Sequence, residues 1–267
     1  MRLAIVSDIH GNLPALEAVF AEIERASVDA VLNLGDIASG PLWPRETLAW
    51  LMARDWPTIA GNHERQLLTQ PPERMSPSDA FAAGAITEAQ RAWLAALPPT
   101  RRFSDAVWCC HGTPASDLVY LLETVTPGFV RGSDPGLRAA SDAELRERMG
   151  DWAGGPELVL CGHSHVPRAQ QCADGPLVLN PGSVGLPAYD DAHPLPHMVE
   201  CGSPHARWAL AERGAGGWSL QLRATVYDHE SAARRAEHNG RGDWADALRS
   251  GRVGRMEHEI GAMNDGR

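Results

Sequence analysis

The 267-residue sequence contains no lysine, so all 24 of its basic side chains are arginines. Schiff-base chemistry and the phosphate-binding lysine of a P-loop are therefore excluded. The basic residues are outnumbered by 34 acidic ones, which leaves a formal net charge of -10. Non-specific binding to nucleic acid depends on a basic surface that releases counterions. We therefore do not expect such binding, and a nuclease is disfavoured.

Cysteine is scarce, and none of the five cysteines forms a Cys-x-x-Cys pair. An odd number without metal-thiolate spacing indicates reduced, mostly buried thiols, as is typical of the cytosol. The sequence also lacks an apolar run of about 18 residues and a signal-peptide pattern. We therefore expect a cytoplasmic protein with no membrane-spanning segment. The oligomeric state is left open.

The first dozen residues contain an apolar run that stops at Asp8-Ile9-His10-Gly11. This pattern predicts a buried parallel strand that presents polar side chains at its carboxyl end, where open α/β sheets bind their ligands. Side chains alternate along a strand, so Asp8 and His10 project to the same side. A carboxylate and an imidazole together suit Mn, Fe or Zn better than Mg or Ca alone. The alternative is a turn stabilised by Asp8.

Four further apolar runs end in the same way, with polar residues beside a glycine. They end at Gly35-Asp36, Gly61-Asn62-His63-Glu64, His111-Gly112 and Gly162-His163-Ser164-His165. A single histidine in a loop is usually solvated or hydrogen-bonded. Here, however, five of the eleven histidines lie at these predicted strand ends. We therefore expect these side chains to meet at one edge of a sheet.

The spacing of apolar residues between these runs predicts helices, and the β-α-β-α-β alternation of the first 60 residues predicts a largely parallel sheet. Capping boxes beginning at Thr87 and Ser141 predict two helix starts. The triplet 120–122 is a candidate short helix. Later in the chain, the pattern predicts two antiparallel strands, around 206–211 and 218–226, followed by one or two helices within 229–250.

We expect a single domain over residues 1–250 and a polar C-terminal tail over 251–267. Residues 113–140 are rich in glycine and proline and follow a strand that ends in a candidate ligand. The sequence is equally consistent with a substrate lid and with a surface insertion. Residues 190–205 are interpreted as an insertion loop that could shape specificity.

Two histidines within this insertion, His193 and His197, have the spacing of a metal-binding pair on a helix. Pro194 and Pro196 are incompatible with the interior of an ordinary helix. We therefore interpret both histidines as loop residues.

The five blocks, in this order, closely resemble the signature blocks of the calcineurin-like metallophosphoesterases. The likeness extends over roughly residues 3–230. The stretches Ser7 to Asn12 and Asn180 to Gly185 resemble the small single-domain bacterial and archaeal phosphodiesterase branch. The resemblance implies an α/β fold, a four-layer α/β/β/α sandwich of two mixed sheets. It is specific for fold and metal chemistry, and much less so for substrate.

The resemblance also implies a centre of two divalent ions, most simply Mn, with Fe, Zn or Ni as alternatives. It assigns His63 to stabilising the transition state, protonating the leaving group and contacting substrate, and Asn12 to substrate contact. Glu64 stands where many relatives have Asp and is expected to orient His63. Asp36 counts as both ligand and catalytic residue. The implied ligands are Asp8, His10 and His165 for the first ion, Asn62, His111 and His163 for the second, and Asp36 as the bridge.

The favoured function is metal-dependent hydrolysis of a phosphodiester in a small nucleotide-like substrate. One alternative is a phosphomonoesterase acting on a phosphoprotein or a dinucleoside polyphosphate. Another is a scaffold that kept the fold and lost catalysis, as happened in a retromer subunit with this fold. The presence of every implied ligand and of His63 argues against the scaffold.

Overall fold

The structure is a computed structural model that describes residues 1–150 and 155–259. Its first sheet contains, in spatial order, β13 (Gly217–Thr225), β12 (Ala206–Gly214), β1 (Arg2–Val6) and β2 (Ala30–Asn33). β1 runs parallel to β2, with Leu3 opposite Ala30. It runs antiparallel to β12, with Arg2 opposite Glu212. The sheet is therefore mixed, and the antiparallel pairing of β12 with β13 agrees with the sequence pattern.

The second sheet contains β3 (Thr100–Ser104), β4 (Val107–Cys110), β7 (Leu158–Leu160), β9 (Leu177–Asn180) and β8 (Arg168–Gln171), in that spatial order. The three central strands are parallel, and the two edge strands are antiparallel to their neighbours. The carboxyl ends of β4 and β7 therefore lie at the same edge.

The two sheets pack face to face because apolar side chains alternate along their strands. Leu3 and Ile5 of β1 belong to the core between the sheets, together with Leu158 and Leu160 of β7. The intervening Val159 belongs to a separate cluster on the outer face of the second sheet. A strand with both faces buried reads as a continuous apolar run, which is why β1 and β7 were recognisable in the sequence.

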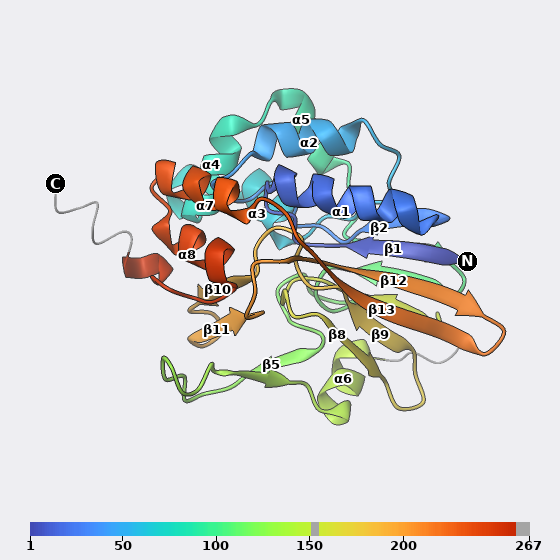
Figure 1. Cartoon of the computed structure of the whole chain (residues 1–267). Coiled ribbons are helices and arrows are strands. Elements are labelled where there is room, and N and C mark those ends of the chain that lie inside the picture. Colours follow the sequence, from blue (N-terminus) through green and yellow to red (C-terminus); the bar gives the residue numbers. More distant parts are fainter. Residues whose placement is uncertain (151–154, 260–267) are drawn as a thin grey trace.

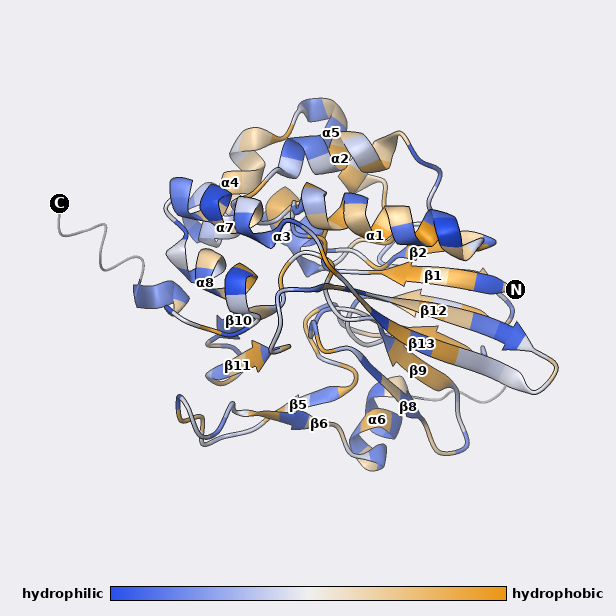
Figure 2. Cartoon of the chain, viewed as in Figure 1, coloured by the Kyte–Doolittle hydropathy of each residue, from blue (hydrophilic) through white to orange (hydrophobic). Residues whose placement is uncertain are grey.

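Helices cover both outer faces of the sandwich (Figure 1). Figure 2 shows β1 as mainly hydrophobic and α7 as mainly hydrophilic toward the viewer. Within the described ranges, no helix is long and apolar enough to span a bilayer. The second sheet is covered by α6 (Asp142–Met149). The first is covered by α1 (Leu13–Ala26), α2 (Pro44–Met52), α3 (Asn62–Thr69), α4 (Pro77–Ala85), α5 (Glu88–Ala95), α7 (His229–His238) and α8 (Gly242–Ser250), with a 3-10 turn, η1, at Pro72–Arg74. The four-layer α/β/β/α sandwich is confirmed.

Two small hairpins occupy segments where the sequence predicted a short helix and an insertion loop. β5 (Glu123–Val125) pairs with β6 (Leu137–Ala139), and the candidate helix at 120–122 does not form. β10 (Ala188–Asp191) pairs with β11 (His197–Glu200), so the predicted insertion loop is largely a hairpin. His197 is a buried strand residue in β11, and the prediction that it lies in a loop was wrong.

Two boundaries also differ from the prediction. The expected third strand, 57–60, pairs with β2 only through a bridge between Asn33 and Thr58. Part of the predicted tail packs on the domain: the Val253 amide donates to Glu200, and the Glu257 amide donates to Asp190. Residues 260–267 of that tail lie outside the described part of the chain.

Candidate metal centre

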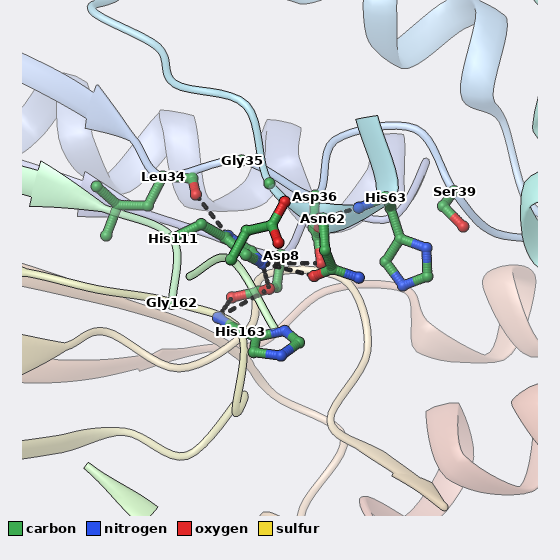
Figure 3. Close-up of polar contacts among 12 residues, drawn as sticks. Asp8, Leu34, Gly35, Asp36, Ser39, Asn62, His63, His111, Gly162 and His163 are labelled. Carbon is green, nitrogen blue, oxygen red and sulfur yellow. Dashed lines mark hydrogen bonds and ion pairs between the residues drawn. The ribbon is translucent and has the colours of Figure 1, made fainter. Parts of the chain in front are cut away.

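The loops that follow four strands bring the predicted ligands together in the middle of the molecule. Asp8 and His10 follow β1, Asp36 follows β2, His111 follows β4, and two histidines of one turn follow β7. Asn62 begins α3. Figure 3 shows Asp8, Asp36, Asn62, His111 and His163 converging on one another. Six of these side chains form two groups whose ligand atoms lie within 4.8 Å of one another, Asp8 with His10 and His165, and Asp36 with His111 and His163.

In the first group, the Nε2 atoms of two ligand histidines face each other. The Nδ1 atoms of His10 and His165 lie 2.8 and 2.7 Å from the carbonyl oxygens of Ser39 and Leu186. A carbonyl can only accept, so each Nδ1 carries the proton and each Nε2 presents a lone pair. These two Nε2 atoms are 3.1 Å apart, and Asp8 Oδ1 is 3.4 Å from that of His165. Such a set of acceptors calls for a cation.

The second group repeats this arrangement. His111 Nδ1 donates to the Leu34 carbonyl at 2.8 Å, which points its Nε2 toward the other ligands of the group. That Nε2 lies 3.1 Å from an Asp36 oxygen and 3.1 Å from Asn62 Oδ1. It is also 4.0 Å from Asp8 Oδ1, so the two groups adjoin each other. Fixing the outer nitrogen of a histidine through a backbone carbonyl is how proteins orient metal-binding imidazoles.

The backbone of the centre is strained. Seven non-glycine residues in the described ranges have a positive φ angle, between 51° and 68°. Left-handed backbone costs a non-glycine residue of the order of 1 kcal/mol or more. Strain of this kind persists where the surrounding structure imposes it, and it concentrates at functional sites. Five of the seven are predicted ligands, namely Asp8, His10, Asp36, His163 and His165.

Close backbone approach explains the glycine beside the ligands of β7. A Cβ atom on Gly162 would collide with Ser7 Oγ and lie 2.9 Å from Asp8 Oδ2. Without that Cβ, the turn comes close enough for the His163 amide to donate to both Asp8 oxygens, at 3.2 and 3.3 Å. A glycine at this position thus holds the β1 and β7 ends together.

Burial and mutual proximity shift the pKa values of the ligands. Burial lowers the pKa of His10 to about 4, with the neighbouring His165 adding to the effect. Burial likewise lowers the pKa of His163 to about 3, aided by His111. Burial alone would raise the pKa of Asp36, but His111 and His63 outweigh it and hold that pKa well below the usual range. His111 differs, because burial is outweighed by the neighbouring Asp36 carboxylate, which raises the pKa of His111 to about 9. In the metal-free site His111 therefore holds a proton that a bound divalent ion would displace, whereas neutral His10 and His163 and ionised Asp36 are already in the states that bind divalent ions.

His63 lies next to this centre and is held by an aspartate that the sequence analysis missed. Its Nδ1 is 2.9 Å from Asp79 Oδ1, and the side chains of His63 and Asp79 are 25% and 2% exposed. Burial lowers the pKa of His63, but the Asp36 and Asp79 carboxylates outweigh this and raise it to about 10. The ring centroid is 5.4 Å from that of His10, so a protonated imidazole stands at the edge of the centre.

Glu64 does not orient His63, contrary to the sequence-based expectation. One of its buried oxygens accepts the amides of Asp36 and Gly61, and the other accepts that of Ile37, all at 2.8 Å. Burial and the charge of Asp36 raise the pKa of Glu64, while these backbone donors oppose the rise. Glu64 therefore fixes the Asp36 loop against the start of α3.

Asn12 also has a different role from the expected substrate contact. It is fully buried, its Oδ1 caps α1 by accepting from Ala15, and its Nδ2 donates to the Gly185 carbonyl and the Tyr227 hydroxyl. Both amide hydrogens are thus engaged inside the protein. These partners connect the loop after β1 to the turn before β10. Asn12 therefore has a structural role, and we do not propose that it contacts substrate.

Two adjoining groups of candidate metal ligands lie at the strand ends of a four-layer sandwich. This arrangement defines a metallophosphoesterase. Residues 1–199 match the calcineurin-like phosphoesterase superfamily domain. The chain therefore belongs to this superfamily of metal-dependent hydrolases that act on phosphoester bonds.

Known relatives agree with this fold across most of the chain. A metallophosphoesterase structure from Sphaerobacter thermophilus is 22% identical, with a TM-score of 0.68 over 94% of this chain and 99% of that one. The structure of a hypothetical protein from Pyrococcus horikoshii is 16% identical, with a TM-score of 0.70 over 94% and 98%. An uncharacterised protein of Methanocaldococcus jannaschii is 24% identical over 209 residues, 69% of this chain and 76% of that protein. The resemblance to small bacterial and archaeal metallophosphoesterases is confirmed.

Proposed function

We propose that this chain hydrolyses a phosphodiester bond of a small nucleotide-like substrate at a centre of two divalent ions. The observation that carries the proposal is the convergence of imidazole nitrogens and carboxylate oxygens in two adjoining groups. The ions would be held by Asp8, His10 and His165 on one side and by Asn62, His111 and His163 on the other, with Asp36 between them.

Two such ions, when bound, supply Lewis acidity toward the phosphoryl oxygens and toward water. The donors are carboxylate and imidazole without thiolate, which suits Mn best and also Fe, Zn or Ni. The chain's own contribution begins with the ligand orientation described above. Since the Nδ1 atoms of three ligand histidines are fixed by backbone carbonyls, their Nε2 atoms are ready to bind without rearrangement.

His63 would be the proton donor to the leaving group. Asp79 engages its Nδ1, so Nε2 is the nitrogen available to the substrate. The His63 amide also donates to Asp36 Oδ1 at 3.0 Å, which fixes the residue against the centre. A general acid must be protonated at the working pH and within reach of the leaving oxygen. The pKa of about 10 in the metal-free site meets the first condition.

Charge at the edge of the centre favours a diester over a monoester. Arg65 lies on α3 three residues after Asn62, and its pKa is raised mainly by the hydrogen bond to Asp117 and less by the charge of Asp36, so Arg65 would be the partner for an additional phosphate charge. Its guanidinium is already bound by Asp117 through two contacts of 2.6 and 2.9 Å. A singly charged diester needs no such partner. A doubly charged monoester would bind more tightly if Arg65 were not paired with Asp117.

The test compares kcat/KM for bis-p-nitrophenyl phosphate and p-nitrophenyl phosphate, with chelator-treated protein reloaded with Mn²⁺. We expect a preference for the diester, and Asp117→Ala, which releases Arg65, should move the preference toward the monoester. A monoester preference in the wild-type protein would identify a phosphomonoesterase. Two bound ions per chain with no turnover of either compound would favour the non-catalytic scaffold.

A further inference from the structure

Two tyrosines pack against the ligand histidines of the turn after β7. The Tyr120 ring lies 4.8 Å from the His163 ring, and the Tyr189 ring lies 4.7 Å from the His165 ring, measured between centroids. Tyr120 comes from the segment after His111, which the sequence analysis considered a lid or an insertion. Tyr189 comes from β10. Each tyrosine therefore covers a ligand of a different proposed ion.

The two tyrosines are joined by their hydroxyls. The Tyr120 and Tyr189 hydroxyl oxygens are 2.7 Å apart, and Tyr120 is also 2.9 Å from His197 Nε2. His197 is 1% exposed, and its Nδ1 donates to the Leu195 carbonyl at 2.8 Å. In its neutral form, His197 therefore accepts from Tyr120. The Tyr189 hydroxyl then directs its proton to Tyr120 or to the His163 carbonyl oxygen, which lies 3.3 Å away. A single chain of hydrogen bonds thus links β11, β10 and the segment after His111.

We propose that Tyr120 and Tyr189 are positioning residues that couple the two ion sites from outside the ligand set. The proposal rests on the proposed binuclear centre. His163 and His165 occupy one turn, and the Leu186 carbonyl already orients the His165 ring, so the tyrosines add a restraint that links the two rings. Rings packed on both imidazoles and tied by one hydroxyl pair restrain them together. Binding of one ion therefore orders the ligand of the other.

The chain offers a matched control for this proposal. It has three tyrosines in all, and the third, Tyr227, is also buried and hydrogen-bonded through its hydroxyl, to Asn12 at 3.1 Å. Substitution by Phe keeps each ring and removes only the hydroxyl. Tyr227→Phe thus measures the general effect of losing a buried hydroxyl near the sheet edge, and it leaves the contact between the Tyr120 and Tyr189 hydroxyls unchanged.

The experiment measures stepwise Mn²⁺ affinities of the full metal-stripped chain by calorimetry, with EPR to detect spin-coupled ion pairs. In Tyr120→Phe and Tyr189→Phe we expect the second ion to bind about three- to tenfold more weakly, and the spin-coupled signal to require correspondingly more Mn²⁺. The loss in the double variant should be smaller than the sum of the two single losses, because both changes break the shared hydroxyl contact. Each change also removes a separate contact, to His197 for Tyr120 and to the His163 carbonyl for Tyr189. Tyr227→Phe should match the wild-type protein.

Unchanged affinities in both tyrosine variants, additive effects in the double variant, or an equal loss in Tyr227→Phe would each overturn the coupling. If Tyr120→Phe does not fold, as judged by the thermal midpoint of the metal-free protein, the comparison of Tyr189→Phe with Tyr227→Phe decides alone. Failure of the proposed function has a different signature, which is seen in the wild-type chain itself. That chain would then bind fewer than two ions, or would bind two ions and either prefer the monoester or turn over neither compound.

Discussion

Replacing Asp79 with asparagine should lower the pKa of His63 and move the alkaline limb of the activity profile to lower pH. The carbonyl of the introduced amide can still accept from His63 Nδ1, and its NH₂ group can donate to Ser76 Oγ, which in the wild-type protein donates to Asp79 Oδ2 at 2.9 Å. The ring should therefore keep its orientation and lose only the neighbouring negative charge. In the metal-loaded site the ions would offset the charge of Asp36, so Asp79 becomes the main support of the protonated ring.

The size of the shift follows from the 2.9 Å contact between His63 Nδ1 and Asp79 Oδ1. The two charges are spread over the imidazolium ring and the carboxylate group, and charges centred about 4 Å apart attract by about 4 kcal/mol at an effective dielectric constant of about 20. One pKa unit corresponds to about 1.4 kcal/mol, so roughly 3 units is the upper bound. The His63 side chain is 25% exposed, and solvent screening reduces the effect. We expect a shift of about 1 to 2 pH units.

The assay is kcat/KM against pH for diesters with an alkyl and a p-nitrophenyl leaving group, at saturating Mn²⁺. A general acid matters most for the poor alkyl leaving group, so the limb should move for that substrate and little for the aryl one. Ser76→Ala is the control, since it removes a hydrogen bond to Asp79 and leaves the carboxylate charge in place. An alkyl profile that is the same in Asp79→Asn and the wild-type protein would refute His63 as the proton donor.

Four further changes test other parts of the centre. His63→Ala should keep two ions per chain by elemental analysis and lose turnover of the alkyl diester by about 100-fold or more, and equal turnover would contradict its catalytic role. Asp36→Asn should bind at most one ion per chain, so a stoichiometry of two would contradict the bridging assignment. Glu64→Ala leaves three buried amides without their acceptor and should reduce the free energy of unfolding, measured in urea, by about 3 kcal/mol or more. Gly162→Ala should cost about 1 to 3 kcal/mol in the same assay because its Cβ meets Ser7, and wild-type stability would show that the strand ends can separate.

The fold and the meeting of the ligands were predictable because both depend on short-range patterns. Fully buried strands give continuous apolar runs, and the polar residue that ends each run marks the sheet edge. The runs before Asp8, Asp36, His111 and His163 each end in this way, and the structure brings their side chains together. The two hairpins were missed because β5, β6, β10 and β11 mix polar with apolar residues and give no continuous apolar run, unlike the equally short β7.

The supporting residues were less accessible, since they lie far from the motifs in sequence. Asp79 reaches His63 from α4, 16 residues away, and reads in the sequence as part of a helix start. Tyr120 and Tyr189 meet across 69 residues. One signal was available: Glu64 stands three residues after Gly61, the position from which a glutamate turns back to the amide at the helix start, although Gly61 has no side chain to complete a capping box. That pattern argued against Glu64 as the partner of His63.

The positive φ angles of the ligands connect folding to metal binding in a way that no sequence pattern displays. Glycine would adopt these angles without strain, yet five such positions carry Asp or His, because glycine offers no ligand atom. The cost, of the order of 1 kcal/mol at each position, is borne by the folded state and is absent from the unfolded chain. Ions that bind only the folded arrangement would offset it by mass action. A metal-stripped chain should therefore unfold at lower urea concentration than the loaded one, and the difference should grow with free Mn²⁺.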